Sequence, residues 1–182
     1  MSGPDTVNIR TFLPSDFAQV QELFASGLME FAGGVERQVQ SYVDSSLKDD
    51  MADIPGNYLS QPRSNFWVAD SGGSPAGSAD APANIIVGMV GIQPRELEEE
   101  AEMRRMSVSS SVRRQGIGRR LLETTEDFCR EKGYRRICLS SVEILQPALA
   151  MYRQFGYTTV KVETYGDPPY GPIVVHQMVK EL

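Results

Sequence analysis

Apolar side chains recur along this chain at two different spacings, which separate helices from strands. Apolar positions three and four residues apart indicate amphipathic helices over residues 17–28, 35–47, 116–132 and 147–155. Short apolar or alternating runs predict strands over residues 7–13, 66–69, 85–93, 102–108, 137–142, 158–165 and 173–179. The run at 85–93 is almost wholly apolar, which is typical of a strand covered on both faces.

The order of these elements predicts the fold class. Strands that follow one another without a helix favour antiparallel hairpins, whereas strands separated by a helix favour parallel crossovers. We therefore expect a single α/β (α+β) domain over residues 1–182, with a mixed central sheet of about seven strands flanked by about four helices. Residues 71–84 are rich in Gly, Ser, Ala and Pro and predict a flexible loop within this domain.

Composition narrows the class of protein. The chain has 182 residues, 41% apolar and 23% charged, as in an ordinary globular domain. Its apolar runs are shorter than the ~20 residues of a membrane-spanning helix, and its first residues carry no secretory signal. The net charge of −6 disfavours a nucleic-acid partner, and Cys129, Cys138 and a lone His176 fit neither a disulfide framework nor a metal site. We therefore expect a cytoplasmic protein that binds no metal, nucleic acid or membrane.

Positive charge is nevertheless concentrated in one segment. Between Arg104 and Arg136 lie ten basic and four acidic residues, so this segment carries +6 while the whole chain carries −6. Such asymmetry favours a polyanionic ligand of limited size, for example a nucleotide cofactor. On charge alone, a solvated helix face remains the simpler interpretation.

The centre of this segment has the pattern of a phosphate site. A strand is followed by a turn with two glycines, and the turn opens a helix whose first N–H groups have no partner within the helix. Such N–H groups and the helix dipole favour phosphate oxygens, which glycines allow to approach the backbone. The candidate phosphate-binding residues are Arg113, Arg114, Gln115, Gly116, Ile117, Gly118 and Arg119.

Single residues count against two common nucleotide-binding motifs. A P-loop requires Lys and then Ser or Thr after its last glycine, and here Arg119 follows Gly118. A dinucleotide fingerprint requires a third glycine where Leu121 stands. The run Arg113-Arg-Gln-Gly-Ile-Gly118 instead resembles the Arg/Gln-x-x-Gly-x-Gly/Ala motif of the GNAT superfamily of acetyl-CoA-dependent N-acetyltransferases.

A second signature supports this resemblance. Residues 148–157, ALAMYRQFGY, are similar to the family's Ala-Ile-x-Leu-Tyr-x-x-x-Gly-Phe helix and turn. The resemblance runs from residue 66 to the C-terminus and is nearest the camello-type branch, which includes cysteine-S-conjugate N-acetyltransferases. That branch usually has a hydrophobic membrane segment between its early helices, where this chain has Gly33, Gly34 and a polar helix. Leu145-Gln-Pro147 also stands where many relatives have an Asn that contacts the cofactor.

The resemblance implies an enzyme that uses acetyl-CoA to acetylate a primary amine of a small molecule or peptide, by direct attack through a tetrahedral intermediate. It implies that the strand residues Met106, Ser107 and Val108 also bind the cofactor, by pairing with its pantetheine amides. It further implies that the backbone N–H of Val108 stabilises the oxyanion, that Tyr152 donates a proton to the leaving thiolate, and that Glu102 is the base. Alternation along the strand predicts that Glu102 shares one face with Arg104 and Met106. A homodimer with exchanged strands remains an alternative to a monomer.

These residues also have structural interpretations. Glu102 continues an acidic run typical of a solvated strand, and Tyr152 fits a core position. Tyr165 and Tyr170 fit either the rim of an acceptor pocket or a rigid loop. Two alternative functions also remain: a catalytically silent acyl-CoA-binding regulatory module, and a nucleotide-binding α/β protein that uses the glycine turn for ATP or NAD.

Overall fold

A seven-stranded sheet organises the chain in the computed structural model, which describes residues 7–72, 85–166 and 172–182. The strand order is β1-β2-β3-β4-β5-β7-β6, and all neighbours are antiparallel except β4 and β5, which are parallel. The strands are β1 (Asn8–Thr11), β2 (Asn65–Asp70), β3 (Ile86–Pro94), β4 (Glu100–Val108), β5 (Arg136–Val142), β6 (Thr158–Tyr165) and β7 (Ile173–Glu181). The predicted mixed sheet of the α/β class is confirmed.

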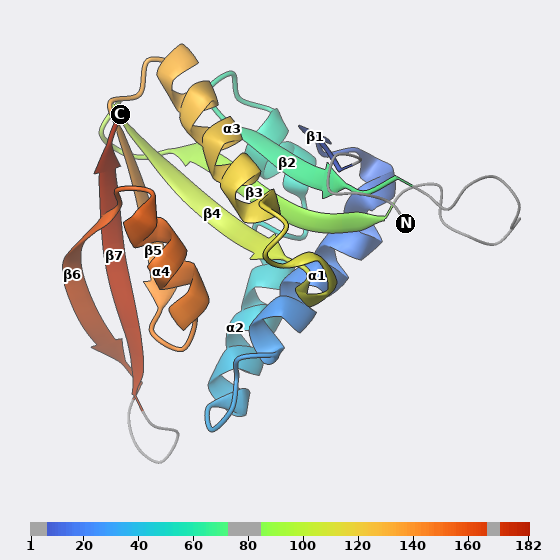
Figure 1. Ribbon diagram of the computed structural model, residues 1–182, viewed down its shortest axis with the longest axis vertical. Helices are drawn as coiled ribbons and strands as arrows, with labels where there is room; N and C mark the ends of the chain where they lie inside the picture. Colours follow the sequence, from blue (N-terminus) through green and yellow to red (C-terminus); the bar gives the residue numbers. More distant parts are fainter. Residues whose placement is uncertain (1–6, 73–84, 167–171) are drawn as a thin grey trace, which may run out of the picture.

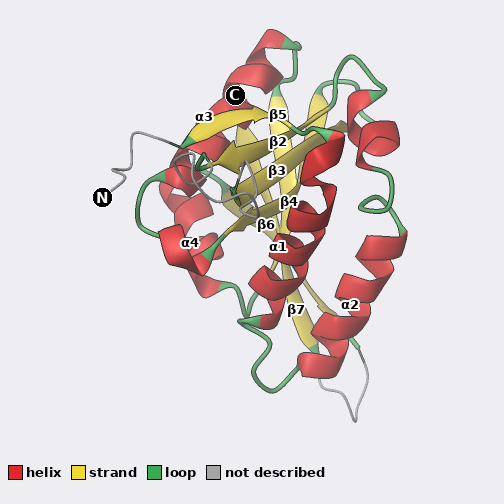
Figure 2. Cartoon of the chain, turned by 90° about the vertical axis from the view of Figure 1, so that its right-hand side faces the viewer, coloured by secondary structure: helices red, strands yellow, loops and turns green. Residues whose placement is uncertain are grey.

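Helices cover both faces of this sheet. Figure 2 shows α1 (Phe17–Met29) and α2 (Glu36–Lys48) on one side, and α3 (Ile117–Glu131) and α4 (Gln146–Gln154) on the other. All four predicted helices are confirmed, and a π-helical turn, Pro55–Leu59, follows α2. Proline in the first turn of α4 loses no helical hydrogen bond, since that N–H has no partner within a helix. The predicted loop at 71–84 lies mostly outside the described residues.

Two hydrophobic cores hold the layers together, one on each face of the sheet. The core beneath α3 and α4 contains Leu121, Ile137, Leu149 and Met178. The core beneath α1 and α2 contains Val20, Val43, Ile54 and Phe66. Full burial of such a side chain contributes about 1.5–3 kcal/mol. Strand β3 supplies side chains to both cores, which confirms that it is covered on both faces.

The sheet opens in its middle, between β4 and β5. These strands pair only where residues 100–103 of β4 face residues 136–139 of β5. Beyond that point β4 continues beside β3 as far as Val108, while β5 continues beside β7 as far as Val142. In Figure 1 the two arms of the sheet meet near the C-terminus and diverge downward. Both diverging strands therefore have an unpaired edge that faces the opening.

A β-bulge interrupts β4 just after its last pair with β5. Gly91 of β3 faces Arg104, but Met89 faces Ser107, so β4 contains one extra residue. Arg105 has a φ of 59°, in the left-handed region that few side chains adopt. The bulge reverses the alternation of faces, because Met106 packs against the same core as Met103. The prediction that Met106 shares a face with Glu102 and Arg104 is therefore wrong.

Candidate active site

A cavity of about 980 Å³ occupies the opening between the two arms of the sheet. Its walls come from α1, α2, β4, the turn before α3, β5, α4 and the ends of β6 and β7. The cavity therefore joins elements that are far apart in the sequence. Of the twelve predicted site residues, all except Gln115 line it. The residues that share this cavity are Glu102, Met106, Ser107, Val108, Arg113, Arg114, Gly116, Ile117, Gly118, Arg119 and Tyr152.

The start of α3 presents unpaired backbone N–H groups at one end of the cavity. The first backbone hydrogen bond of α3 joins the Arg120 N–H to the carbonyl of Gly116. Within the described residues, no acceptor binds the N–H groups of residues 116–119. Gly116 has a φ of +78°, and a Cβ added there would meet no atom within 4 Å. The open space beside this left-handed glycine allows an anion to approach the N–H groups and the positive end of the helix dipole.

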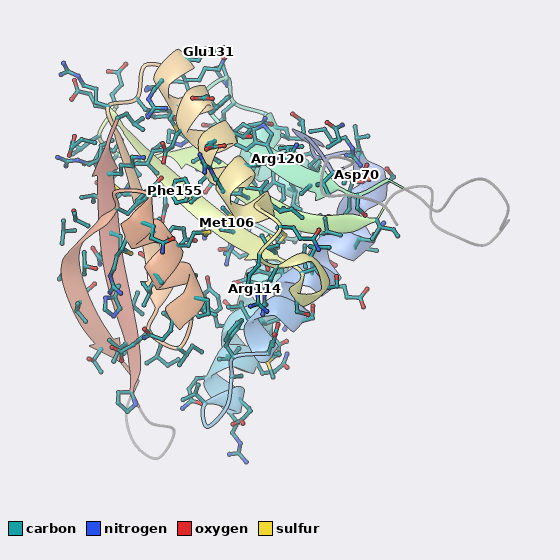
Figure 3. The ribbon with its side chains drawn as sticks, viewed as in Figure 1. Asp70, Met106, Arg114, Arg120, Glu131 and Phe155 are labelled. Carbon is teal, nitrogen blue, oxygen red and sulfur yellow. The ribbon has the colours of Figure 1, made fainter. Side chains whose placement is uncertain are left out.

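The arginines of this turn differ in what they contact. The Arg113 guanidinium donates to both carboxylate oxygens of Glu30, at 2.7 and 2.6 Å, and lies 5.0 Å from the centre of the Phe31 ring. Arg119 donates to Glu123 at 2.7 Å, one turn along α3. Arg114 forms no ion pair within the described part of the chain, and Figure 3 shows it at the turn beside α1. Arg114 is therefore the arginine of this turn whose charge is free for a ligand.

The unpaired edge of β4 forms one wall of the cavity. Ser107 and Val108 pair with β3 on one side only, and Met106 lies between them and the bulge with no partner on β5. Figure 3 shows Met106 in the space between α3 and α4. On the opposite face, α1 packs closely on the strand, because a Cβ added to Gly27 would lie 2.6 Å from the Ser107 Oγ. The backbone groups on this edge can therefore form sheet-like hydrogen bonds with an extended ligand.

Tyr152 reaches the cavity from α4. Its side chain is buried, and its ring packs edge-on against Tyr157 with the ring centres 5.8 Å apart. Its hydroxyl forms no hydrogen bond with any described residue. Burial raises the pKa of Tyr152, so its phenol is protonated at neutral pH. The arrangement provides a proton donor on the cavity wall.

Glu102 lies on the other face of β4 from Met106. It faces Gln93 of β3 and Cys138 of β5, and its side chain is half-buried on the cavity wall. No hydrogen bond or ion pair holds its carboxylate among the residues that the structure describes. The carboxylate is therefore available to accept a proton or to bind a cation.

A buried polar cluster beside the bulge was not predicted from the sequence. It consists of Asp50, Arg105, Tyr42, Ser46 and Tyr58, called here the Asp50 cluster. The Arg105 Nε donates to Asp50 Oδ2 at 3.0 Å and its Nη2 to Asp50 Oδ1, while its Nη1 donates to Tyr42 at 2.7 Å and to Ser46 at 3.0 Å. The Tyr58 hydroxyl also donates to Asp50. Burial alone would raise the pKa of Asp50, but the hydrogen bonds from Arg105 and Tyr58 outweigh it and lower this pKa.

The other candidate polar residues line the cavity, are buried, or lie outside the described residues. Tyr165 lines the cavity and donates to Glu163 at 2.9 Å, while Tyr170 lies outside the described residues. Cys129 and Cys138 are buried free thiols, and burial raises the pKa of Cys129 to about 12. His176 is buried on β7, and neither ring nitrogen has a hydrogen-bond partner among the described residues, although its Nε2 lies 3.6 Å from the Glu143 Oε1. Within the described residues, no group of His, Cys, Asp and Glu side chains could hold a metal ion.

The sequence pattern of the Acetyltransferase (GNAT) family matches residues 34–157, which is more than half of the chain. The chain belongs to the GNAT acetyltransferase family. Among the similar proteins, N-acetyltransferase 8 of Rattus norvegicus is 37% identical over 122 residues, which is 65% of this GNAT chain and 50% of the relative. The camello protein of Xenopus tropicalis is 30% identical over 145 residues, covering 79% of this chain and 58% of the relative. The matched part of the chain thus spans about half the length of these relatives.

Solved structures share the GNAT fold. A GNAT-family acetyltransferase from Staphylococcus aureus superposes with a TM-score of 0.67 at 22% identity, covering 94% of this chain and 98% of that one. A protein from Salmonella typhimurium, whose structure contains its cofactor acetyl-CoA, has a TM-score of 0.65 at 16% identity, covering 97% and 94%. Identities this low bear on the fold alone. In the part of this GNAT chain that the structure describes, no helix is both long and apolar enough to cross a membrane.

Proposed function

We propose that this GNAT protein transfers an acetyl group from acetyl-CoA to a primary amine of a small molecule or peptide, by direct attack of the amine. The observation that carries the proposal is one cavity containing four unpaired N–H groups at residues 116–119, the free edge of β4 and the buried Tyr152. Family membership supports acetyl transfer as the chemistry. Acetyl-CoA would supply an acetyl group activated as a thioester.

The residues on the cavity wall fit the parts of acetyl-CoA. The unpaired N–H groups of residues 116–119 and the guanidinium of Arg114 would bind its pyrophosphate. The backbone of Met106 and Val108 would pair with the amides of its pantetheine arm. Arg113 would support this turn through its ion pair with Glu30 rather than bind phosphate directly.

Three groups would then assist the reaction. The backbone N–H of Val108 would stabilise the negative charge on the attacked carbonyl oxygen, since it is fixed before the reaction begins. The Tyr152 phenol would donate its proton to the leaving sulfur, and its raised pKa keeps that proton in place at neutral pH. Glu102 would accept a proton from the amine, directly or through one water molecule.

The acceptor's own pKa decides how much Glu102 contributes. A lysine-like amine has a pKa of about 10.4, so deprotonating it at pH 7 costs about 4–5 kcal/mol. An α-amine, with a pKa of about 7.7–8.0, costs only about 1 kcal/mol. We expect Glu102→Gln to impair acetylation of a lysine side chain much more than that of a peptide N-terminus.

The first experiment measures thermal unfolding with acetyl-CoA, CoA, ATP or NAD, each added alone. A ligand at about 100 times its Kd adds about 2.7 kcal/mol, which corresponds to about 5–10 °C in a domain of this size. We expect both CoA species to raise the Tm, and ATP and NAD to leave it unchanged. A flat response to CoA contradicts the proposal, and a shift with ATP or NAD alone favours a nucleotide-binding protein.

The second experiment measures release of the CoA thiol with a panel of amines: a peptide α-amine, an Nα-blocked lysine peptide and a polyamine. Turnover with one class names the acceptor type. Binding of CoA without turnover on any amine would contradict acetyl transfer and favour a silent acyl-CoA-binding module.

A further inference from the structure

Arginine is an unusual residue at the bulge of β4, where Arg105 has a positive φ. Of the described residues other than glycine, only Arg105 and Arg114 have a positive φ, and Arg105 is the buried one. Glycine would adopt this conformation without strain, so the arginine side chain has to compensate for its backbone. Strained backbone of this kind persists where the surrounding contacts hold it, and it concentrates at functional sites.

The contacts of Arg105 are already satisfied within the protein. Its guanidinium makes two hydrogen bonds to Asp50, one to Tyr42 and one to Ser46, and lies 5.1 Å from the centre of the Phe24 ring. These bonds use four of its five N–H donors. Arg105 therefore has little capacity to bind a substrate, although it lines the cavity. Its influence on the reaction has to pass through the groups that it holds.

Those groups belong to two elements that line the cavity, β4 and α2. Arg105 stands one residue before Met106, where the free edge of β4 begins, and two residues after Met103, the last residue to pair with β5. Its partners Ser46 and Tyr42 belong to α2, and Tyr42 also lines the cavity. Asp50 follows the end of α2 and is itself held by Tyr58. The cluster thus joins the strand with the proposed cofactor edge to a helix that also lines the cavity.

We propose that Arg105, held by Asp50, is a positioning residue that fixes the bulge so that the backbone of residues 106–108 faces the cavity in the geometry that acetyl-CoA binding requires. This inference rests on the proposed function for its ligand. It assigns the Asp50 cluster a role in orienting the strand in addition to any role in stability.

A second ion-pair cluster supplies a matched control. Arg10 of β1 donates to both carboxylate oxygens of the buried Asp16, at 2.7 and 3.0 Å, and also to Asp70. Arg10 therefore also makes a forked contact with a buried aspartate, but β1 is an edge strand and does not line the cavity. Arg10→Lys and Arg105→Lys each keep the positive charge and lose the planar fork.

The test compares these two lysine variants in the full chain. We expect Arg105→Lys to raise the Kd and the KM for acetyl-CoA about tenfold, because displacement of binding groups by about 1 Å has effects of this order or larger. The pH dependence of kcat should stay unchanged, since Tyr152 is untouched. Both variants should lower the Tm by similar amounts. Arg10→Lys should leave the Kd within about twofold of wild type, as a distant substitution does. Equal effects of the two variants on the Kd would overturn the proposal.

Two further measurements keep the test decisive. Hydrogen exchange of the peptide spanning residues 104–109 should speed up in Arg105→Lys and stay unchanged in Arg10→Lys, with no ligand present. If the wild-type protein fails to bind acetyl-CoA, the proposed function fails while this exchange comparison still decides the role of Arg105. If Arg105→Lys does not fold, Ser46→Ala removes one bond to Arg105; it should raise the Kd about threefold, and a wild-type Kd would refute the proposal.

Discussion

The two halves of β4 have different neighbours, and the difference separates stability from binding. Residues 100–103 pair with β3 on one side and β5 on the other, and Ala101 and Met103 are buried in the core. Beyond Met103, β4 pairs with β3 alone and is interrupted by the bulge, and Met106, Ser107 and Val108 are only partly buried. Backbone groups that form no hydrogen bond within the fold are available to a ligand. We therefore expect substitutions of the fully buried side chains in the closed half to affect folding, and substitutions around the open half to affect ligand binding. Glu102 is the exception in the closed half, because its half-buried side chain lines the cavity and is the proposed base.

The largest effect is expected opposite the open half, at Tyr152. Tyr152→Phe removes the proposed proton donor and should lower kcat by about 10²–10⁴-fold with little change in Tm. Tyr157→Phe is the matched control, because its hydroxyl is buried without a partner among the described residues and its loss should leave kcat unchanged. Burial raises the pKa of Tyr152, so wild-type kcat should not fall between about pH 8 and 10 through loss of its proton. Comparable kcat values for the two variants would remove Tyr152 from the mechanism.

Beside the closed half, Ile137→Ala on β5 should lower the free energy of unfolding by about 2–5 kcal/mol, since it opens a cavity in a packed core. Ile137 pairs with Ala101 of β4 and does not line the active-site cavity. Denaturant unfolding measures this loss. The Kd for acetyl-CoA, measured at a temperature where the variant is folded, should match wild type. A weakened Kd at unchanged stability would show that the two halves are not separate in function.

The two ends of α3 allow a closely matched comparison, in which the expected effect on binding is smaller. Gly116 and Gly133 both have a φ of +78°, and an added Cβ meets no atom within 4 Å at either position. Alanine at either position should cost about 1–2 kcal/mol of stability, because both need a left-handed backbone. Gly116→Ala alone should also raise the Kd for acetyl-CoA, by about tenfold, since its Cβ enters the space in front of the unpaired N–H groups. Calorimetric titration of both variants checks this, and equal Kd values would place the phosphate site elsewhere.

The smallest effect is expected from surface charge. Arg114→Gln should weaken acetyl-CoA binding about two- to fivefold, as exposed ion pairs contribute about 0.2–1 kcal/mol, and the loss should shrink at high salt. Arg120→Gln removes the same charge from α3 but lies outside the cavity lining, so its Kd should stay at the wild-type value. Figure 3 shows both arginines. An identical change in both variants would mean that only the overall charge of this segment matters.

The sequence predicted the elements better than it predicted their contacts. Periodicity located every strand and all four α-helices, because burial of one face of a helix or strand sets the spacing of apolar residues that are close in the sequence. The glycine turn before α3 and the position of Tyr152 on α4 were also readable, since both belong to short motifs. Their meeting in one cavity depends on the β4–β5 opening, which is a property of strand pairing rather than of any local pattern.

The bulge and its cluster were missed for the same physical reason. Alternation assumes an unbroken strand, so it assigned Met106 to the wrong face. One signal was present, because two adjacent charged residues, Arg104 and Arg105, break the alternation in the middle of a strand. Nothing local connects Arg105 to Asp50, which lies 55 residues earlier, or Arg113 to Glu30, which lies 83 residues earlier. Such pairs become visible only in three dimensions.

The bulge lies at the start of the open half of β4, so a change in its backbone angle displaces the rest of that half. Val108 lies three residues beyond Arg105, a length of about 10 Å in an extended strand. A rotation of about 10° at Arg105 would therefore move Val108 by roughly 1.7 Å, more than the ~1 Å misplacement that can cost an enzyme a hundredfold in rate. A small change of backbone angle at Arg105 therefore becomes a large displacement of Val108. The position of the backbone groups next to the reacting atoms thus depends on how firmly the bulge is held.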